Sequence, residues 1–203
     1  MKLPEHFAVS FLLAQFGPQQ EWGPAGTCLM VAAGVLPDLD GISILGGWRC
    51  HRIYHRVVGH GLPVTLFGPA LLAYLGVAAF DLGPFLPLWL WLQASLLGHL
   101  VTDVCFYRWP AQLLWPFSTW GVGFGLIAWN DLVPTLLLYG GTVLIWLGAS
   151  EVVAWIAVAG LAFYILCRAC IPRPAFGWWG WLTGNWARQS WPFWRWLTGD
   201  FIT

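Results

Sequence analysis

The sequence predicts an all-α polytopic membrane protein with about six transmembrane helices and an interfacial, Trp-rich C-terminal segment. Hydrophobic residues make up 59% of its 203 residues and charged residues only 9%, whereas a typical soluble domain carries roughly 25% charged residues. The apolar residues gather into segments near the length of about 20 residues that crosses a bilayer. The basic residues, moreover, fall only at the two ends of the chain, in alternate connections between these segments and, for Arg168, near the end of the last segment, which is typical of a multi-pass protein.

Six apolar segments account for the predicted helices. Four are long enough to span a bilayer alone, and two shorter ones are expected to form a hairpin that turns at Gly17, Pro18, Gln19 and Gln20. Prolines near several of the proposed starts are compatible with helix, because the first turn does not need their missing N–H. In chain order, the six segments are 4–17, 23–37, 61–80, 85–107, 132–150 and 151–171.

The distribution of charge predicts the orientation. If both termini are cytoplasmic, six spans place all nine lysines and arginines on the cytoplasmic side, and the outer turns carry only Glu21, Asp81 and Glu151. This is the positive-inside pattern. We therefore expect a protein of the inner (plasma) membrane, with the lipid bilayer as its partner and both termini in the cytoplasm. The sequence does not indicate an oligomeric state.

Two parts of the chain differ in composition. Residues 1–175 are expected to form the helical transmembrane domain, and residues 176–203 a tryptophan-rich tail lying on the membrane. A tail that guides substrate is the alternative to simple anchoring. The net charge of zero, without a basic run, gives no reason to expect nucleic-acid binding. The five cysteines are expected to be free thiols, with Cys167 and Cys170 either an acylation site or a coincidence.

Histidines and aspartates are concentrated where this topology brings the cytoplasmic ends of the segments together. Ionisable groups are costly in a membrane, so such a concentration usually indicates function. Histidine with carboxylate is also the ligand combination that zinc and similar divalent metals prefer. The residues that arrive at this face are His6, Asp38, Asp40, His55, His60, His99 and Asp103.

Each motif also has a simpler explanation. His99 and Asp103 are four residues apart, so they share a helix face and can bind one metal, but a hydrogen-bonded pair between helices would look the same. Asp38 and Asp40 can point at a common cation or be a solvated turn. Residues 49–61 hold three histidines and three arginines, and a basic interfacial helix attracted to anionic lipid would explain the arginines but not the histidines.

Taken in order, these motifs resemble the LexA-regulated, membrane-bound metal-dependent hydrolase family. The resemblance covers residues 5–118, a little over half the chain. It is carried by Glu5-His6-Phe7, Leu36-Pro37-Asp38-Leu39-Asp40, His55-Arg56-x-x-x-His60, Gly98-His99-x-x-x-Asp103 and Leu114-Trp115-Pro116-Phe117-Ser118.

The resemblance implies metal binding by His6, Asp38, Asp40, His60, His99 and Asp103, with His55 and Arg56 close by. The family commonly reads His-Arg-Gly-x-Thr-His-Ser where this chain reads His-Arg-Val-Val-Gly-His-Gly. The hydroxyls at 59 and 61 are therefore missing, which puts the family's substrate contacts in doubt here, and His51 has no counterpart. The helix motif is also similar to that of zinc-dependent phospholipases C, a hint at the type of reaction.

We therefore expect a metal-dependent hydrolase that acts on an ester or phosphoester, in a lipid or another amphiphile, at the cytoplasmic face. Its cofactor would be a divalent metal, with zinc the first candidate, as one ion or two. The expected catalytic residues are Asp40, which could act as base or bridge a second metal, with His55, and Arg56, which could hold an oxyanion. The alternatives are a metal or ion transporter and a non-catalytic membrane protein with a structural metal.

Overall fold

The computed structural model describes residues 2–105, 110–127 and 131–170, and in these ranges every regular element is helical. The only ladder pairing among them is an isolated bridge between Ala111 and Val122. The prediction of an all-α fold is confirmed. The elements are α1 (Leu3–Ala14), α2 (Pro18–Val35), the 3-10 helix η1 (Leu36–Gly46), α3 (Trp48–Tyr54), α4 (Leu62–Phe80), α5 (Phe85–Cys105), α6 (Leu132–Trp146) and α7 (Val152–Cys170).

Four helical stretches in the described ranges are long and apolar enough to cross a membrane, namely 18–46, 62–80, 85–105 and 152–170. The helices α1 and α6 are apolar but have only 12 and 15 residues. At about 1.5 Å per residue they reach roughly 18 and 22 Å, less than the hydrocarbon thickness of about 30 Å. The prediction of about six spans is therefore not confirmed, and the orientation of the termini stays a prediction.

The second predicted segment begins where the chain kinks. Helix α2 starts at Pro18, but Gly23 interrupts it with φ 58° and ψ −149°, and Pro24 follows directly. The positive φ suits a residue without a Cβ atom, and the proline then opens a new first turn. The expected start at residue 23 therefore marks the kink, and one more turn of helix precedes it.

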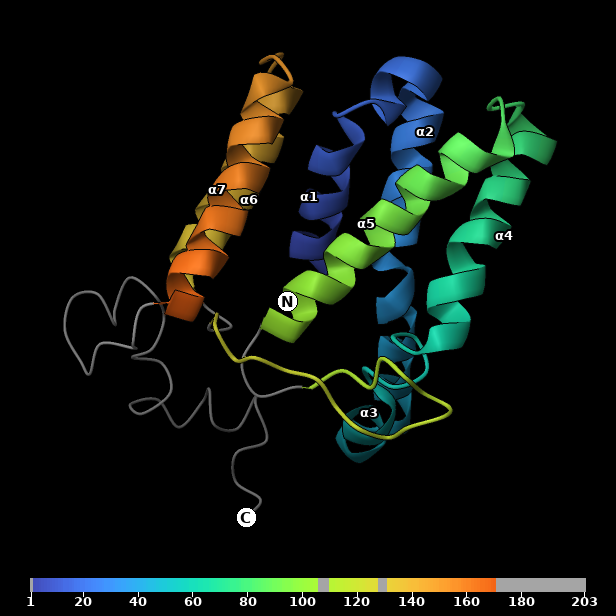
Figure 1. Ribbon diagram of the computed structural model, residues 1–203, viewed down its shortest axis with the longest axis vertical. Helices are drawn as coiled ribbons and strands as arrows, with labels where there is room; N and C mark the ends of the chain where they lie inside the picture. The colour runs from blue at the N-terminus through green and yellow to red at the C-terminus, as the bar shows by residue number, and fades with distance from the viewer. Residues whose placement is uncertain (1, 106–109, 128–130, 171–203) are drawn as a thin grey trace.

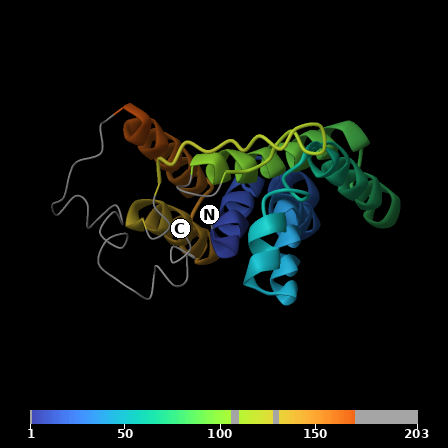
Figure 2. The ribbon, with the colours of Figure 1, turned by 90° about the horizontal axis from the view of Figure 1, so that it is seen from below.

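Helix α1 lies at the centre of the bundle. Figures 1 and 2 show it between the α6–α7 pair on one side and α2, α4 and α5 on the other. One buried apolar cluster joins α1 to α6 and α7 around Leu12, Leu138 and Leu161, and a second joins α2, α4 and α5 around Met30, Ala73 and Leu92. The short α1 is thus stabilised by packing on several sides, and it brings its N-terminal residues to the same end of the bundle as the end of α5.

Helices α1, α2 and α5 cross closely at Gly34. A Cβ atom built on Gly34 would lie 1.7 Å from Ser10 Oγ and 2.7 Å from Ser95 Oγ, so no side chain fits there without moving a helix. Ser95 Oγ donates to the carbonyl of Met30 at 2.7 Å. This crossing fixes the position of α5 along the axis of α2.

Asp131 connects α6 and α7. It is the N-cap of α6 and accepts a hydrogen bond from Val133 N at 3.1 Å. Its other oxygen accepts from the hydroxyl of Tyr164 on α7 at 2.6 Å. Burial raises the pKa of Asp131 to about 6, although these hydrogen bonds and the nearby Arg168 act in the opposite direction.

The predicted Trp-rich tail, residues 176–203, lies outside the described residues. The division into a membrane domain and a tail therefore stays a prediction. All five cysteines lie in described segments and are free thiols, as expected.

Replacing Gly34 by alanine is expected to destabilise the fold by about 1–3 kcal/mol, because the added methyl forces the crossing helices apart. Gly140 on α6 is the matched control, since a Cβ atom there meets nothing within 4 Å. Gly140→Ala is expected to be neutral or stabilising by about 0.5–1 kcal/mol. Thermal unfolding of both variants in detergent measures the difference, and equal melting temperatures would contradict the close crossing.

Asp131→Asn is expected to remove a pH dependence of stability. A carboxyl group whose pKa is raised on folding favours the folded state while it is protonated, fully below about pH 4, and that contribution is lost as the pH rises through about 6. The amide keeps one accepting oxygen for the cap, and its NH2 group can donate to the hydroxyl oxygen of Tyr164. The melting temperature of the variant, relative to wild type, should therefore rise between about pH 4 and about pH 6. A constant difference across this range would show that Asp131 does not titrate there.

Candidate metal centre

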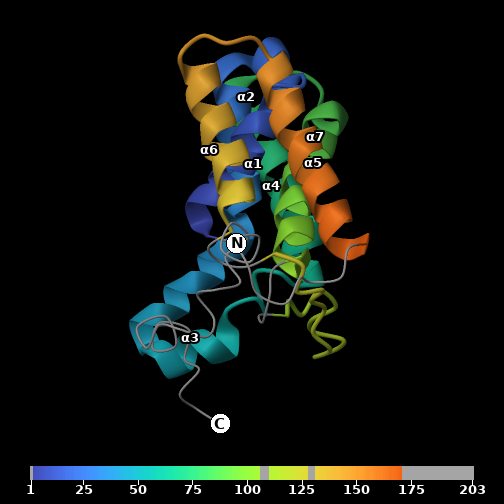
Figure 3. The same cartoon turned by 90° about the vertical axis from the view of Figure 1, so that its left-hand side faces the viewer.

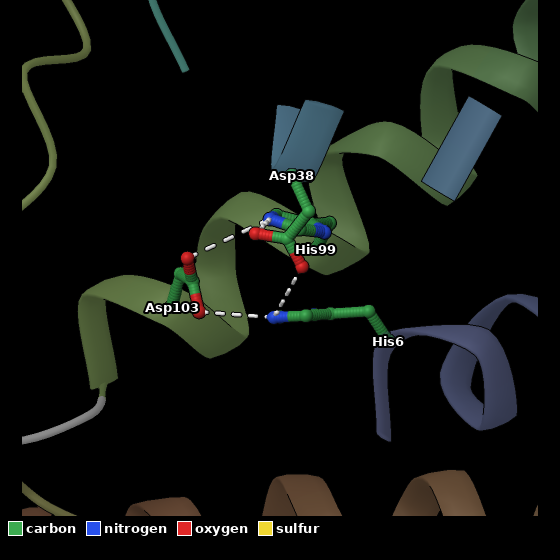
Figure 4. A group of neighbouring side chains, drawn as sticks. All are labelled: His6, Asp38, His99 and Asp103. Atoms are coloured by element: carbon green, nitrogen blue, oxygen red, sulfur yellow. Dashed lines mark ion pairs between the residues drawn. The ribbon is translucent and has the colours of Figure 1, made fainter. Parts of the chain in front are cut away.

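Four side chains from three segments far apart in the sequence converge at one end of the bundle. His6 comes from the first turns of α1, Asp38 from η1, and His99 and Asp103 from the last turns of α5. One ligand atom of each lies within 4.8 Å of the others, and Figure 4 shows the two imidazoles and two carboxylates facing a common centre. His6, His99 and Asp103 are almost fully buried. The structure thus brings together four of the six residues for which metal binding is predicted.

The carboxylate of Asp103 is the most heavily contacted group of the cluster, and its side chain is 0% exposed. Its Oδ1 accepts a hydrogen bond from Arg56 Nη2 at 2.8 Å and lies 3.0 Å from His6 Nε2. Its Oδ2 lies 3.0 Å from His60 Nε2 and 3.5 Å from His99 Nε2. A buried carboxylate is costly unless positive or hydrogen-bonding groups surround it, and here the partners come from α1, from the connection before α4 and from α5 itself.

Backbone contacts select the form of His99. Its Nδ1 lies 2.7 Å from the carbonyl oxygen of Gly34, so Nδ1 carries the proton and Nε2 presents its lone pair when the ring is neutral. Nε2 is the atom that faces Asp38 Oδ1 at 3.8 Å and Asp103. This is the arrangement of a metal-binding histidine, whose other nitrogen is held by a hydrogen bond.

His6 is stacked on His99, with 3.6 Å between the ring centroids. Its Nε2 lies 3.0 Å from Asp103 Oδ1 and 3.8 Å from Asp38 Oδ2, but neither contact satisfies this buried nitrogen with a geometric hydrogen bond. A buried nitrogen in this condition calls for an explanation. A cation between the three side chains would supply the missing partner.

His60 is a fifth candidate donor beside this cluster of four. Its Nδ1 lies 3.2 Å from Asp40 Oδ2, and its Nε2 lies 3.2 Å from His99 Nε2 as well as close to Asp103. Burial alone would lower the pKa of His60, but its hydrogen bonds to Asp103 and Asp40 outweigh burial and raise it above the ordinary value. The two carboxylates thus hold the ring from both sides.

Asp40 faces away from the cluster. Its Oδ1 accepts from His55 Nδ1 at 2.7 Å, and its Oδ2 accepts from the backbone N–H of Arg56 at 2.8 Å as well as approaching His60. Successive residues of a 3-10 helix are about 120° apart, so Asp38 and Asp40 lie on different edges of η1. That Asp40 itself binds metal stays a prediction; the contacts show it holding two histidines and a backbone turn.

Arg56 turns towards the cluster through an uncommon backbone conformation. Its φ is 64°, in the left-handed region that a residue with a Cβ atom adopts at some cost. The turn ends α3 at Tyr54 and separates Arg56 from Arg52, so the two do not share a helix face. The side chain is 3% exposed and reaches Asp103, so the guanidinium expected to hold an oxyanion contacts a carboxylate of the site.

The two glycines that replace the family's hydroxyl residues fit the packing. A Cβ atom on Gly59 would lie 2.0 Å from the carbonyl oxygen of Pro37, and one on Gly61 would lie 2.9 Å from that of Trp115. The loop after α5 is also hydrogen-bonded here, since Leu62 N donates to Trp115 O at 3.0 Å. The backbone therefore approaches η1 and this loop in the space that hydroxyl side chains would need.

His51 and Glu5 are the two residues whose placement the sequence does not indicate. His51 stacks on His55 with ring centroids 4.5 Å apart, and its Nδ1 lies 3.3 Å from Ser43 Oγ, so it points along η1 rather than into the cluster. Glu5 is 1% exposed and accepts hydrogen bonds from Lys2 N at 3.0 Å and from Thr135 Oγ1 at 3.2 Å. Its position in the first turn of α1 is the only sequence signal that it anchors the helix carrying His6.

The donor set fits a divalent metal such as zinc. Bonds of about 2.0–2.2 Å in a tetrahedral site place ligand atoms roughly 3.3–3.6 Å apart. The four histidine–aspartate separations, taken to either carboxylate oxygen, run from 3.0 to 3.8 Å, and one ligand atom from each of the four residues lies within 4.8 Å of the others. Two imidazoles with two carboxylates are also a ligand mixture that zinc accepts.

Comparison with known proteins gives a family. The chain matches the family described as YdjM inner membrane protein over residues 1–175, which is most of its length and includes every residue of the cluster. None of the curated proteins and none of the solved structures matches it. The chain therefore belongs to the YdjM inner membrane protein family.

Proposed function

We propose that this protein is a membrane-bound, metal-dependent hydrolase that cleaves an ester or phosphoester of an amphiphilic substrate. We further propose that the site lies at the cytoplasmic face, as the charge distribution predicts. The observation that carries the proposal is the convergence of His6, Asp38, His99 and Asp103 on one point, with one buried nitrogen lacking a partner. Ionisable groups gathered at one end of a membrane protein favour a chemical role over a structural one.

The position of the donors favours a hydrolase over a transporter. Transport sites usually lie near the middle of the bilayer, often where helices are broken. Here the donors come from the first turns of α1, from η1 and from the last turns of α5, so all of them lie at one end of the bundle. A site at a helix end can meet a water molecule and an amphiphile together.

The contacts divide the site into groups that would bind the metal and groups that orient the ligands or balance their charge. His6, Asp38, His99 and Asp103 would hold the metal, with His60 beside them. When bound, the metal would supply Lewis-acid chemistry to the scissile group and to water. Gly34 O keeps the proton of His99 on Nδ1, and Arg56 balances the charge of Asp103.

Asp40 orients His60 and connects it to His55. The carboxylate lies between the two Nδ1 atoms, at 2.7 Å from His55 and 3.2 Å from His60. The His55 side chain is 15% exposed, so it is the imidazole of this row that water can reach. We propose that Asp40 and His55 take part in the reaction from the side of the cluster that water can reach.

Metal content is the first test. Purified wild-type protein should retain a divalent metal, measured by elemental mass spectrometry after loading with zinc or manganese. Asp38→Asn and His99→Gln should lose it, since each removes a donor from the cluster. Asp40→Asn should keep the metal but bind it roughly 10–100-fold more weakly, because Asp40 acts through His60.

Asp131→Asn is the matched control for this experiment, because it makes the same change at another buried carboxylate whose hydrogen-bond partners are Val133 and Tyr164 and not the residues of the cluster. It should bind metal like wild type. A wild-type protein that stays metal-free after loading would overturn the proposal. Equal metal loss in all three aspartate variants would show that the cause is unfolding and not loss of a ligand.

Turnover is the second test. The metal-loaded protein in detergent should hydrolyse at least one probe from a panel of p-nitrophenyl esters, bis-p-nitrophenyl phosphate and fluorogenic phospholipids. Chelation with EDTA and the His99→Gln substitution should each abolish that activity. Added zinc should restore the activity of the chelated wild-type protein but not that of the variant. Bound metal that raises the melting temperature without any turnover would instead support a structural metal. Zinc uptake into proteoliposomes that is lost in Asp103→Asn would support a transporter.

A further inference from the structure

An uncovered stripe of aliphatic side chains runs along η1. A 3-10 helix has about 3.0 residues per turn, so residues three apart lie on the same edge. Leu39, Ile42 and Leu45 follow this spacing and are 63%, 71% and 83% exposed. Exposure increases with distance from the bundle, and Figure 3 shows η1 continuing past the ends of the other helices with α3 at its far end.

The length of this stretch shows that η1 extends beyond the hydrocarbon. Helix α2 has 18 residues and η1 has 11, which correspond to about 27 Å and about 22 Å. Their combined length exceeds a hydrocarbon layer of about 30 Å by a wide margin. If α2 crosses the bilayer, η1 therefore enters either water or the headgroup region. Three large aliphatic side chains on one edge are unfavourable in water.

The polar edge of η1 is already covered. Asp40 contacts His55, and Ser43 contacts His51, so α3 and the residue after it pack against this edge. Leu39, Ile42 and Leu45 are more exposed than Ile44, which is 45% exposed and lies on the edge that holds Asp38. η1 is thus amphipathic, and α3 fixes the direction of its polar edge.

Charge on the adjoining helix indicates what lies next to the stripe. Helix α3 carries Arg49, which is exposed, and its neighbours Ile53 and Tyr54 are 57% and 51% exposed. Of the charged side chains described in η1 and α3, Arg49 is the exposed one, because the side chains of Asp38 and Asp40 are only 10% and 6% exposed. An apolar edge beside an exposed arginine matches a membrane interface with anionic headgroups.

We propose that η1 and α3 form a docking surface for the anionic headgroup region of the membrane. Leu39, Ile42 and Leu45 lie at the boundary between the headgroups and the hydrocarbon, and Arg49 lies at the level of the lipid phosphates. This surface does not depend on the proposed reaction. It does place Asp38 and Asp40, which belong to the same η1, at the depth of the lipid headgroups.

The depth of η1 can be measured with nitroxide labels on the full chain. Ile42→Cys and Leu45→Cys are each introduced into a variant whose native cysteines are replaced, and the protein is placed in vesicles. Leu71→Cys on α4, 60% exposed, is the reference for a lipid-facing position. Glu151→Cys, in the exposed turn before α7, is the reference for water. Accessibility to oxygen and to a water-soluble nickel chelate then gives the depth of each label.

We expect the labels at 42 and 45 to favour oxygen over the nickel chelate, as at Leu71 but less strongly. In vesicles with one quarter phosphatidylglycerol they should lie deeper than in pure phosphatidylcholine, and Arg49→Gln should reduce this difference. Accessibility like that of Glu151 would overturn the proposal. Equal depth in both lipids would also overturn the proposal, because it would show that anionic headgroups do not attract this surface. Spin–spin broadening of the label at 45 would overturn it too, because it would indicate that a second copy of the chain covers the stripe. Thermal unfolding of each labelled protein shows that it is folded.

Discussion

The buried carboxylate of Asp103 is the group on which the arrangement of this end of the molecule depends. It is the common neighbour of Arg56 and of His6, His60 and His99. These residues belong to α1, the connection before α4, and α5 itself. Without partners, a carboxylate in this position would be strongly unfavourable. The same contacts that satisfy it therefore hold three parts of the chain at fixed positions.

Much of the fold could be predicted from hydropathy, because apolar segments of sufficient length and the turns between them leave a clear signal. The number of spans was harder to predict, since α1 and α6 are apolar but short, and apolar composition alone does not distinguish a span from a packed helix. The sequence also predicted that the histidines and aspartates gather at one end of the bundle. This prediction requires only that successive connections lie on alternate sides of the membrane.

The sequence did not predict which residues of the site contact one another. Spacing left open whether Asp38 and Asp40 face a common cation or form a solvated turn, and the 3-10 geometry of η1 directs them to different partners. The sequence does not indicate the left-handed turn at Arg56 that directs its side chain to Asp103. Both outcomes depend on contacts between distant segments, which local sequence patterns do not contain.

The order of the segments along the chain also bears on biosynthesis. Every donor of the cluster lies within the first 103 residues, so the N-terminal part contains the whole site before α6 and α7 leave the ribosome. The later hairpin then packs on α1 and reaches Glu5 through Thr135. During membrane insertion, the part of the chain that carries the cluster can therefore assemble first, and the last two helices then pack on α1.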